Sequence, residues 1–145
     1  MRIAGILPSS FVNGDGCRYV VFLQGCSHHC DGCHNPETWD FHGGYDYPLE
    51  AIVHDYKKRE KYLDGITLSG GDPFYQQKQC IELLKLIRPK NVWIYTGFEY
   101  EDIKNTELAS MADVIVAGRF IKELACSGKM YGSSNQKIIR RRNDG

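Results

Sequence analysis

The sequence predicts an α/β fold with a mostly parallel sheet, and two observations lead to that prediction. Short runs of β-branched and aromatic residues alternate along the chain with segments of helical periodicity, and strands in such alternation pair in parallel through right-handed crossovers. About four or five such units are too few for the usual closed barrel. We therefore expect an open partial (β/α) barrel or a small doubly wound sheet, with a site at the carboxyl ends of the strands.

The first two strands are predicted from apolar runs that stop at turn residues. Residues 3–12 are apolar, although Pro8 interrupts them, and they end in the turn-rich segment 13–16. Residues 18–24 are rich in β-branched and aromatic side chains without alternation, which is typical of a strand buried on both faces.

Helical periodicity returns after residue 48. Pro48 suits a first helical turn, and the apolar positions that follow share one face. A second helix is expected from about Phe74 to the Arg88–Pro89 stop, and a weaker one over 100–111. The remaining predicted strands are residues 65–69, 92–97 and 113–118.

Length and composition favour one folded domain over residues 1–145. Apolar residues make up 42% of the chain and charged residues 25%, which is ordinary globular usage. The 18 basic and 18 acidic side chains cancel, so no global charge favours nucleic acid or an anionic membrane as a partner. No membrane-spanning stretch or signal-peptide profile is evident. We expect a cytoplasmic protein that binds neither nucleic acid nor membrane.

A cluster of cysteines lies in the long loop predicted over residues 25–47. Cys26, Cys30 and Cys33 would supply three thiolates, the ligands that iron–sulfur clusters prefer, and a cubane held by three ligands keeps one iron open. A structural zinc site is the alternative at this spacing. It would combine the same thiolates with a neighbouring histidine: His28, His29 or His34.

A second candidate feature is the turn after the strand at 65–69. Gly70 and Gly71 lack Cβ atoms, so backbone polar groups there can approach a ligand closely. Taken by itself, this turn is equally typical of a tight connection between a strand and a helix. The cysteine loop, this turn and Thr96–Gly97 each follow a strand of the predicted parallel set, so all three are expected at one edge.

The pairing of a Cys-x3-Cys-x2-Cys loop with a Gly-Gly-Asp-Pro turn resembles the radical S-adenosylmethionine superfamily. The resemblance implies a [4Fe-4S] cluster on the three cysteines and S-adenosylmethionine on the open iron. It also implies that Gly70, Gly71 and Asp72 receive the amino group of that ligand, and that Thr96 contacts its ribose or sulfonium region. The residue before the last cysteine is commonly aromatic there, but here it is Gly32, so adenine contacts are expected from the backbone near Gly32, Cys33 and His34.

The chain further resembles one group within that superfamily, the activating proteins of anaerobic ribonucleoside-triphosphate reductase. The resemblance implies an oxidoreductase that generates a glycyl radical on the large reductase subunit, with a flavodoxin-like or other one-electron donor. An activase of the pyruvate formate-lyase type and a non-catalytic zinc or iron–sulfur module are the alternatives. The blocks that carry the resemblance are residues 13–18, 32–36, 68–73, 95–97 and 132–136.

Overall fold

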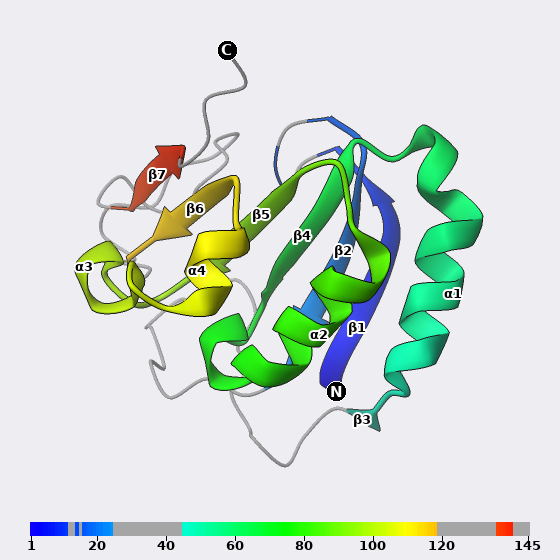
Figure 1. Cartoon of the computed structure of the whole chain (residues 1–145), viewed down its shortest axis with the longest axis horizontal. Helices are drawn as coiled ribbons and strands as arrows, with labels where there is room; N and C mark the ends of the chain where they lie inside the picture. Colours follow the sequence, from blue (N-terminus) through cyan, green and yellow to red (C-terminus); the bar gives the residue numbers. More distant parts are fainter. Residues whose placement is uncertain (12–13, 15, 25–44, 119–135, 141–145) are drawn as a thin grey trace.

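The structure is a computed structural model that describes residues 1–11, 14, 16–24, 45–118 and 136–140. Within this part of the chain, a seven-stranded sheet has the order β3-β1-β2-β4-β5-β6-β7 (Figure 1). The strands are β1 (Arg2–Ser10), β2 (Arg18–Leu23), β3 (Tyr45–Asp46), β4 (Gly65–Gly70), β5 (Val92–Thr96), β6 (Val114–Ala117) and β7 (Lys137–Arg140).

The centre of the sheet is parallel. β2 pairs in parallel with β4, β4 with β5, and β5 with β6. At the two sides, β1 is antiparallel to both β2 and β3, and β7 is antiparallel to β6. The prediction of an α/β fold with an open sheet and a parallel centre is confirmed. The sheet as a whole is mixed, because the three pairings at its flanks are antiparallel and were not predicted. The partial-barrel type stays a prediction.

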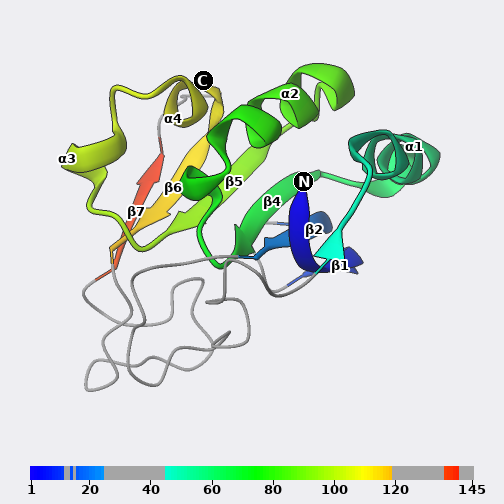
Figure 2. The same cartoon turned by 90° about the horizontal axis from the view of Figure 1, so that it is seen from below.

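The helices lie on one face of the sheet, as Figure 2 shows. The α-helices are α1 (Leu49–Arg59), α2 (Gln77–Ile87), α3 (Tyr100–Ile103) and α4 (Glu107–Met111), and two 3-10 helices are η2 (Glu60–Tyr62) and η3 (Pro73–Tyr75). Helix α2 packs between α1 and α4.

The single helix predicted over 100–111 is wrong, because Thr106 divides it. The Thr106 hydroxyl donates to the carbonyl oxygen of Ile103 at 2.7 Å, and its oxygen accepts from the Ala109 amide at 3.2 Å. The same side chain therefore binds the end of α3 and caps the start of α4. Threonine favours such local bonds over a helix interior.

The main core lies between the sheet and the helices. Alternate residues of the central strands point to it, among them Val21, Leu68, Ile94 and Ile115, all fully buried. Cys80 on α2 is also fully buried there, which confirms that it behaves as a small apolar residue. This core covers the face of the inner strands that is turned toward the helices. The other face of the sheet carries Trp93 and the buried Arg18.

On the opposite face, Arg18 is 1% exposed and lies across the amino ends of the strands. Its guanidinium donates to the Thr67 hydroxyl and to the carbonyl of Ile66, both at 2.8 Å, and to the Asn91 carbonyl at 3.1 Å. It also stacks over the Trp93 ring, 5.7 Å from its centroid. Buried charge is tolerated because it is hydrogen-bonded on several sides.

The block at residues 13–18 has a structural explanation at this end of the sheet. A Cβ on Gly14 would lie 2.7 Å from Arg18, and one on Gly16 would lie 2.3 Å from a carboxylate oxygen of Asp64. Both glycines have positive φ, which side chains rarely adopt. This block therefore shapes the amino end of β2, at the opposite end from the predicted site.

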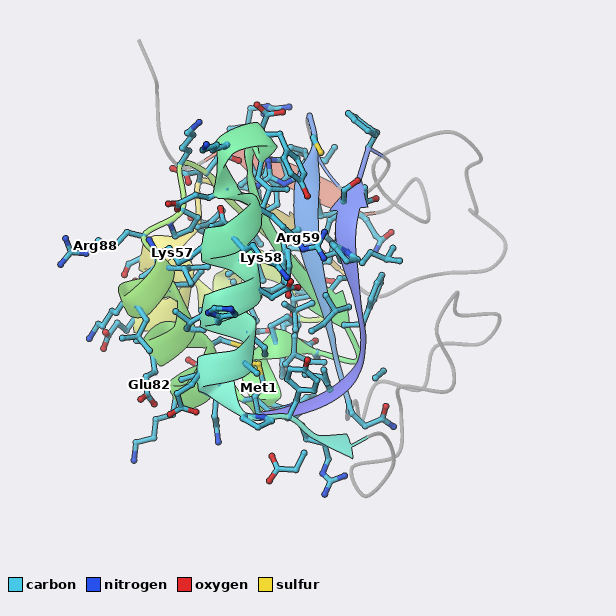
Figure 3. The ribbon with its side chains drawn as sticks, turned by 90° about the vertical axis from the view of Figure 1, so that its right-hand side faces the viewer. Met1, Lys57, Lys58, Arg59, Glu82 and Arg88 are labelled. Carbon is cyan, nitrogen blue, oxygen red and sulfur yellow. The ribbon has the colours of Figure 1, made fainter. Side chains whose placement is uncertain are left out.

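Side chains of the outer helix surface are drawn in Figure 3. Three basic residues, Lys57, Lys58 and Arg59, occupy the last turn of α1, where they complement the helix dipole. Lys57 donates to the carbonyl oxygen of Ile87 at the end of α2, which ties the two helices together.

No helix in the described ranges is long and apolar enough to cross a membrane.

Candidate functional site

The carboxyl ends of the parallel strands meet at one edge of the sheet. Leu23 of β2 pairs with Gly70 of β4, and Thr96 of β5 pairs with Ala117 of β6. The turn Gly71–Asp72 and residue Gly97 follow directly. The predicted residues Gly70, Gly71, Asp72 and Thr96 are therefore brought together, as the parallel pairing of their strands required.

Gly70 is fitted closely against β2. Its φ is +94°, and a Cβ there would lie 2.4 Å from the Leu23 nitrogen and 2.6 Å from its carbonyl oxygen. The next amide, Gly71 N–H, donates to the Leu23 carbonyl at 2.7 Å. A glycine at position 70 thus allows the turn to lie against the strand that leads into the cysteine loop.

Replacing Gly70 by alanine is expected to lower the free energy of unfolding by about 3 kcal/mol, because both the positive φ and the backbone overlap oppose a side chain. Urea denaturation of the apo protein measures the change. Gly5→Ala is the matched control, since a Cβ on Gly5 meets no atom within 4 Å. Equal stability of the two variants would contradict this account of the turn.

Asp72 joins the ends of two strands. Its side chain is fully buried, and its carboxylate accepts hydrogen bonds from the Thr96 hydroxyl at 2.9 Å, the Gly97 amide at 2.9 Å and the Phe74 amide at 3.1 Å. The bonds to Thr96 and Gly97 cross from the β4 turn to the end of β5. Charge-assisted bonds of this kind hold backbone groups in a fixed arrangement.

The Thr96 hydroxyl is part of this network rather than open to solvent. It is 4% exposed, donates to the Asp72 carboxylate and accepts from the Phe98 amide at 3.1 Å. Its interaction with Asp72 fixes the position at which the chain leaves β5. The described contacts therefore give Thr96 a positioning role at this edge, and its contact with ribose or sulfonium stays a prediction.

The described residues that flank segments 25–44 and 119–135 also lie at this edge. Ile3 of β1 pairs with both Leu23 and Tyr45. The residues before and after segment 25–44 therefore lie at the same level of the sheet. The Gln136 side-chain amide donates to the Gly118 carbonyl at 2.9 Å, which joins the two flanks of segment 119–135.

Five of the predicted site residues lie outside the described residues, so their roles stay predictions. They are Cys26, Cys30, Gly32, Cys33 and His34. Cys126 lies outside as well, whereas Cys17 and Cys80 are both buried as free thiols. Among the side chains that the structure describes, no group of three or more potential metal ligands occurs. The iron–sulfur and zinc alternatives therefore both depend on the cysteine loop.

Sequence reasoning missed Gln76, which lies four residues after Asp72. Its side-chain amide reaches the backbone of Arg2, at 2.7 and 2.9 Å, and that of Gln24, at 3.2 Å. A glutamine near the start of a helix carries no local signal for such contacts, because both partners are remote in sequence.

Cys80 is close to the site, but its chemistry is that of a neutral thiol. Its sulfur lies 3.8 Å from the Pro73 carbonyl oxygen. Burial, together with the smaller effect of the nearby negative charge of Asp72, raises the pKa of the Cys80 thiol from 9.0 to about 12. A thiol held neutral in this way is a poor nucleophile and a poor metal ligand.

The raised pKa predicts a loss of stability at alkaline pH. Above pH 9 the unfolded chain releases the Cys80 proton while the folded chain keeps it, so the free energy of unfolding should fall by up to about 1.4 kcal/mol per pH unit. This stabilisation is fully present below pH 9 and is lost as the pH rises toward 12. Burial also raises the pKa of Tyr19, and it raises that of Tyr56 from 10.0 to about 12. Urea unfolding of reduced apo protein between pH 8 and about 9.5 stays below the pH at which these tyrosines ionise in the unfolded chain, so it reports mainly the cysteine. Cys80→Ala should flatten this slope, and an unchanged slope would refute the assignment.

Comparisons with known proteins identify the family of the chain. A family profile described as the 4Fe-4S single cluster domain matches residues 12–139. Several relatives are named anaerobic ribonucleoside-triphosphate reductase-activating protein. That of Enterobacteria phage T4 is 38% identical, with 95% of this chain and 93% of the relative covered. That of Haemophilus influenzae is 32% identical, with 92% of this chain and 94% of the relative covered. That of Escherichia coli K12 is also 32% identical, with 90% of this chain and 93% of the relative covered. On this evidence the chain belongs to the family of anaerobic ribonucleoside-triphosphate reductase-activating proteins and contains a 4Fe-4S single cluster domain.

Proposed function

We propose that this protein is a radical S-adenosylmethionine enzyme that activates anaerobic ribonucleoside-triphosphate reductase by forming a glycyl radical on its large subunit. The observation that supports this most is the meeting of β2, β4 and β5 at one edge. The strand that leads into the cysteine loop lies directly beside the Gly70–Gly71 turn. Two parts of the sequence that are about forty residues apart can therefore contribute to one site.

The residues at this edge fit the groups that the proposal requires. Cys26, Cys30 and Cys33 would hold a [4Fe-4S] cluster, since thiolates are its preferred ligands. The Gly70–Gly71 turn, which lies against β2 because Gly70 has no Cβ, would receive the amino group of S-adenosylmethionine. Asp72 and Thr96 would fix the geometry of that backbone through their mutual hydrogen bond. The backbone near Gly32 and His34 would contact the adenine.

The chemistry follows from what such a cofactor supplies. Cys26, Cys30 and Cys33 would hold the cluster and the Gly70–Gly71 turn would hold S-adenosylmethionine; together these groups would supply one-electron reductive cleavage of the sulfonium and removal of a hydrogen atom from one glycine α-carbon of the partner. The protein's own part is to orient the groups and to exclude competing reactions. A sheet that does not close into a barrel would suit a peptide segment of another protein as the substrate.

The proposed partners are the large reductase subunit and a flavodoxin-like or other one-electron donor, and the proposed location is the cytoplasm. The relatives' shared name favours the reductase over a target of the pyruvate formate-lyase type. A non-catalytic module that binds zinc is the candidate from a different functional class.

Anaerobic purification followed by metal analysis and a cleavage assay tests the proposal. The protein is expected to bind about four irons per chain after reconstitution and to release 5′-deoxyadenosine from S-adenosylmethionine when dithionite is added. A colourless protein that contains zinc, and that releases no 5′-deoxyadenosine, would establish the non-catalytic alternative instead.

A further inference from the structure

Gln76 occupies the joint between η3 and α2, just beyond the glycine turn. Its backbone amide donates to the Pro73 carbonyl, and its own carbonyl accepts from the Cys80 amide. With φ −131° and ψ 43°, the residue belongs to neither helix. Its backbone is therefore fixed to the segment that begins at the turn, so anything its side chain holds is held relative to that turn.

The side chain of Gln76 uses its carbonyl oxygen and both of its N–H groups on two backbone segments. Its Oε1 accepts from the Arg2 amide at 2.9 Å, and its Nε2 donates to the Arg2 carbonyl at 2.7 Å and to the Gln24 carbonyl at 3.2 Å. A primary amide offers one carbonyl oxygen and two N–H groups. Each of them is matched here.

The contact with Gln24 is what relates Gln76 to the site. The parallel pairing of β2 with β4 ends at Leu23, and Gln24 is the last described residue before the cysteine loop. Beyond that ladder, the Gln24 amide donates to the Arg2 carbonyl at 3.1 Å, the same oxygen that Gln76 binds. Hydrogen bonds thus join Gln24, Arg2 and Gln76 to one another. Gln24 lies two residues before Cys26.

We propose that Gln76 is a positioning residue that fixes the start of the cysteine loop against the glycine turn. The inference rests on the proposed function, in which these two segments hold the cluster and its ligand. This side chain then extends the positioning by the β2–β4 ladder and the Gly71–Leu23 bond one residue further, to Gln24. A displacement of about 1 Å between the two halves is enough to impair such a site.

Two substitutions and two controls test the proposal. Gln76→Ala removes all three bonds, and Gln76→Glu keeps the shape but presents a carboxylate to the Arg2 and Gln24 carbonyls, with no N–H to donate. Gln79 is an exposed residue of α2. The controls Gln79→Ala and Gln79→Glu therefore make the same chemical changes away from the contact. Melting temperature is recorded for all four variants, so that a general loss of stability is recognised.

Hydrogen exchange of the apo protein is the first measurement. The Gln24 amide should exchange about tenfold faster in both Gln76 variants, the effect of losing roughly one net hydrogen bond, and should be unchanged in the Gln79 variants. Unchanged exchange in Gln76→Glu would overturn the proposal. This exchange measurement needs neither the cluster nor S-adenosylmethionine. It therefore tests whether Gln76 fixes Gln24 even if the proposed function fails.

The second measurement is the concentration of S-adenosylmethionine that half-saturates the change in the EPR spectrum of the reduced, reconstituted protein. We expect it to rise about tenfold in the Gln76 variants, with iron content retained. Faster exchange together with an unchanged half-saturation value would mean that Gln76 only stabilises the fold, which overturns a positioning role. A wild-type spectrum that does not respond to S-adenosylmethionine would count against the proposed function itself.

Discussion

Replacing Cys30 by alanine is expected to abolish release of 5′-deoxyadenosine, with a fall of at least about 1000-fold. Cys30 is the middle cysteine of the proposed cluster site, and its loss would leave two thiolates for a cubane that needs three protein ligands. Iron bound after anaerobic reconstitution should fall in parallel, because thiolate ligation is what retains the cluster. High-performance liquid chromatography of the nucleoside product and iron analysis measure the two effects.

Cys17→Ala is the matched control for that variant. Cys17 is buried at the amino end of β2, at the opposite end of the strand from the proposed site. Its variant should bind as much iron as the wild type and keep its activity within about twofold. Loss of iron and activity in both variants, or in neither, would contradict the assignment of the cluster to residues 26, 30 and 33.

Replacing Asp72 by asparagine is expected to have the second-largest effect. One carboxylate oxygen becomes an NH2 group, which faces either the Phe74 amide or the Gly97 amide, so in both orientations a donor meets a donor. We expect the free energy of unfolding to fall by about 2 to 4 kcal/mol, because a buried, charge-assisted network is broken. We also expect cleavage of S-adenosylmethionine to fall about 100-fold, because the glycine turn loses its fixed position.

The Thr96 variants separate the hydrogen bond from the bulk of the side chain. Thr96→Ser keeps the hydroxyl that binds Asp72 and should retain most of the activity, whereas Thr96→Val keeps the shape and should lose about tenfold. Assays at saturating S-adenosylmethionine distinguish weaker binding from slower chemistry. Wild-type activity in both Asp72→Asn and Thr96→Val would show that this network does not position the site.

The parallel centre of the fold could be predicted from the sequence because its signals are local. The strand predicted at residues 65–69 agrees with β4, and the helix stop at Arg88 agrees with the end of α2, where Arg88 adopts positive φ. Once those strands are parallel, topology requires their carboxyl ends to share an edge. The proximity of Gly70, Asp72 and Thr96 follows from this rule without further information.

Other features could not be predicted, because they depend on partners that are remote in sequence. β7 is a short, basic strand without clear alternation, and it is identified by its antiparallel pairing with β6 and by the position of Arg140 over the Trp93 ring, 5.5 Å from the centroid. The role of Gln76 likewise depends on backbone groups 52 and 74 residues away. Tertiary contacts of this kind leave no local pattern.

The central claim is tested most directly by EPR spectroscopy of the target. The reconstituted protein is mixed anaerobically with S-adenosylmethionine, dithionite and the large subunit of the reductase from the same organism. We predict a radical signal split into a doublet by one α-hydrogen, which collapses to a singlet when the subunit contains glycine deuterated at the α-carbon. We also predict that the signal is absent with Cys30→Ala. No radical on the reductase, or one that forms equally well with Cys30→Ala, would contradict the account.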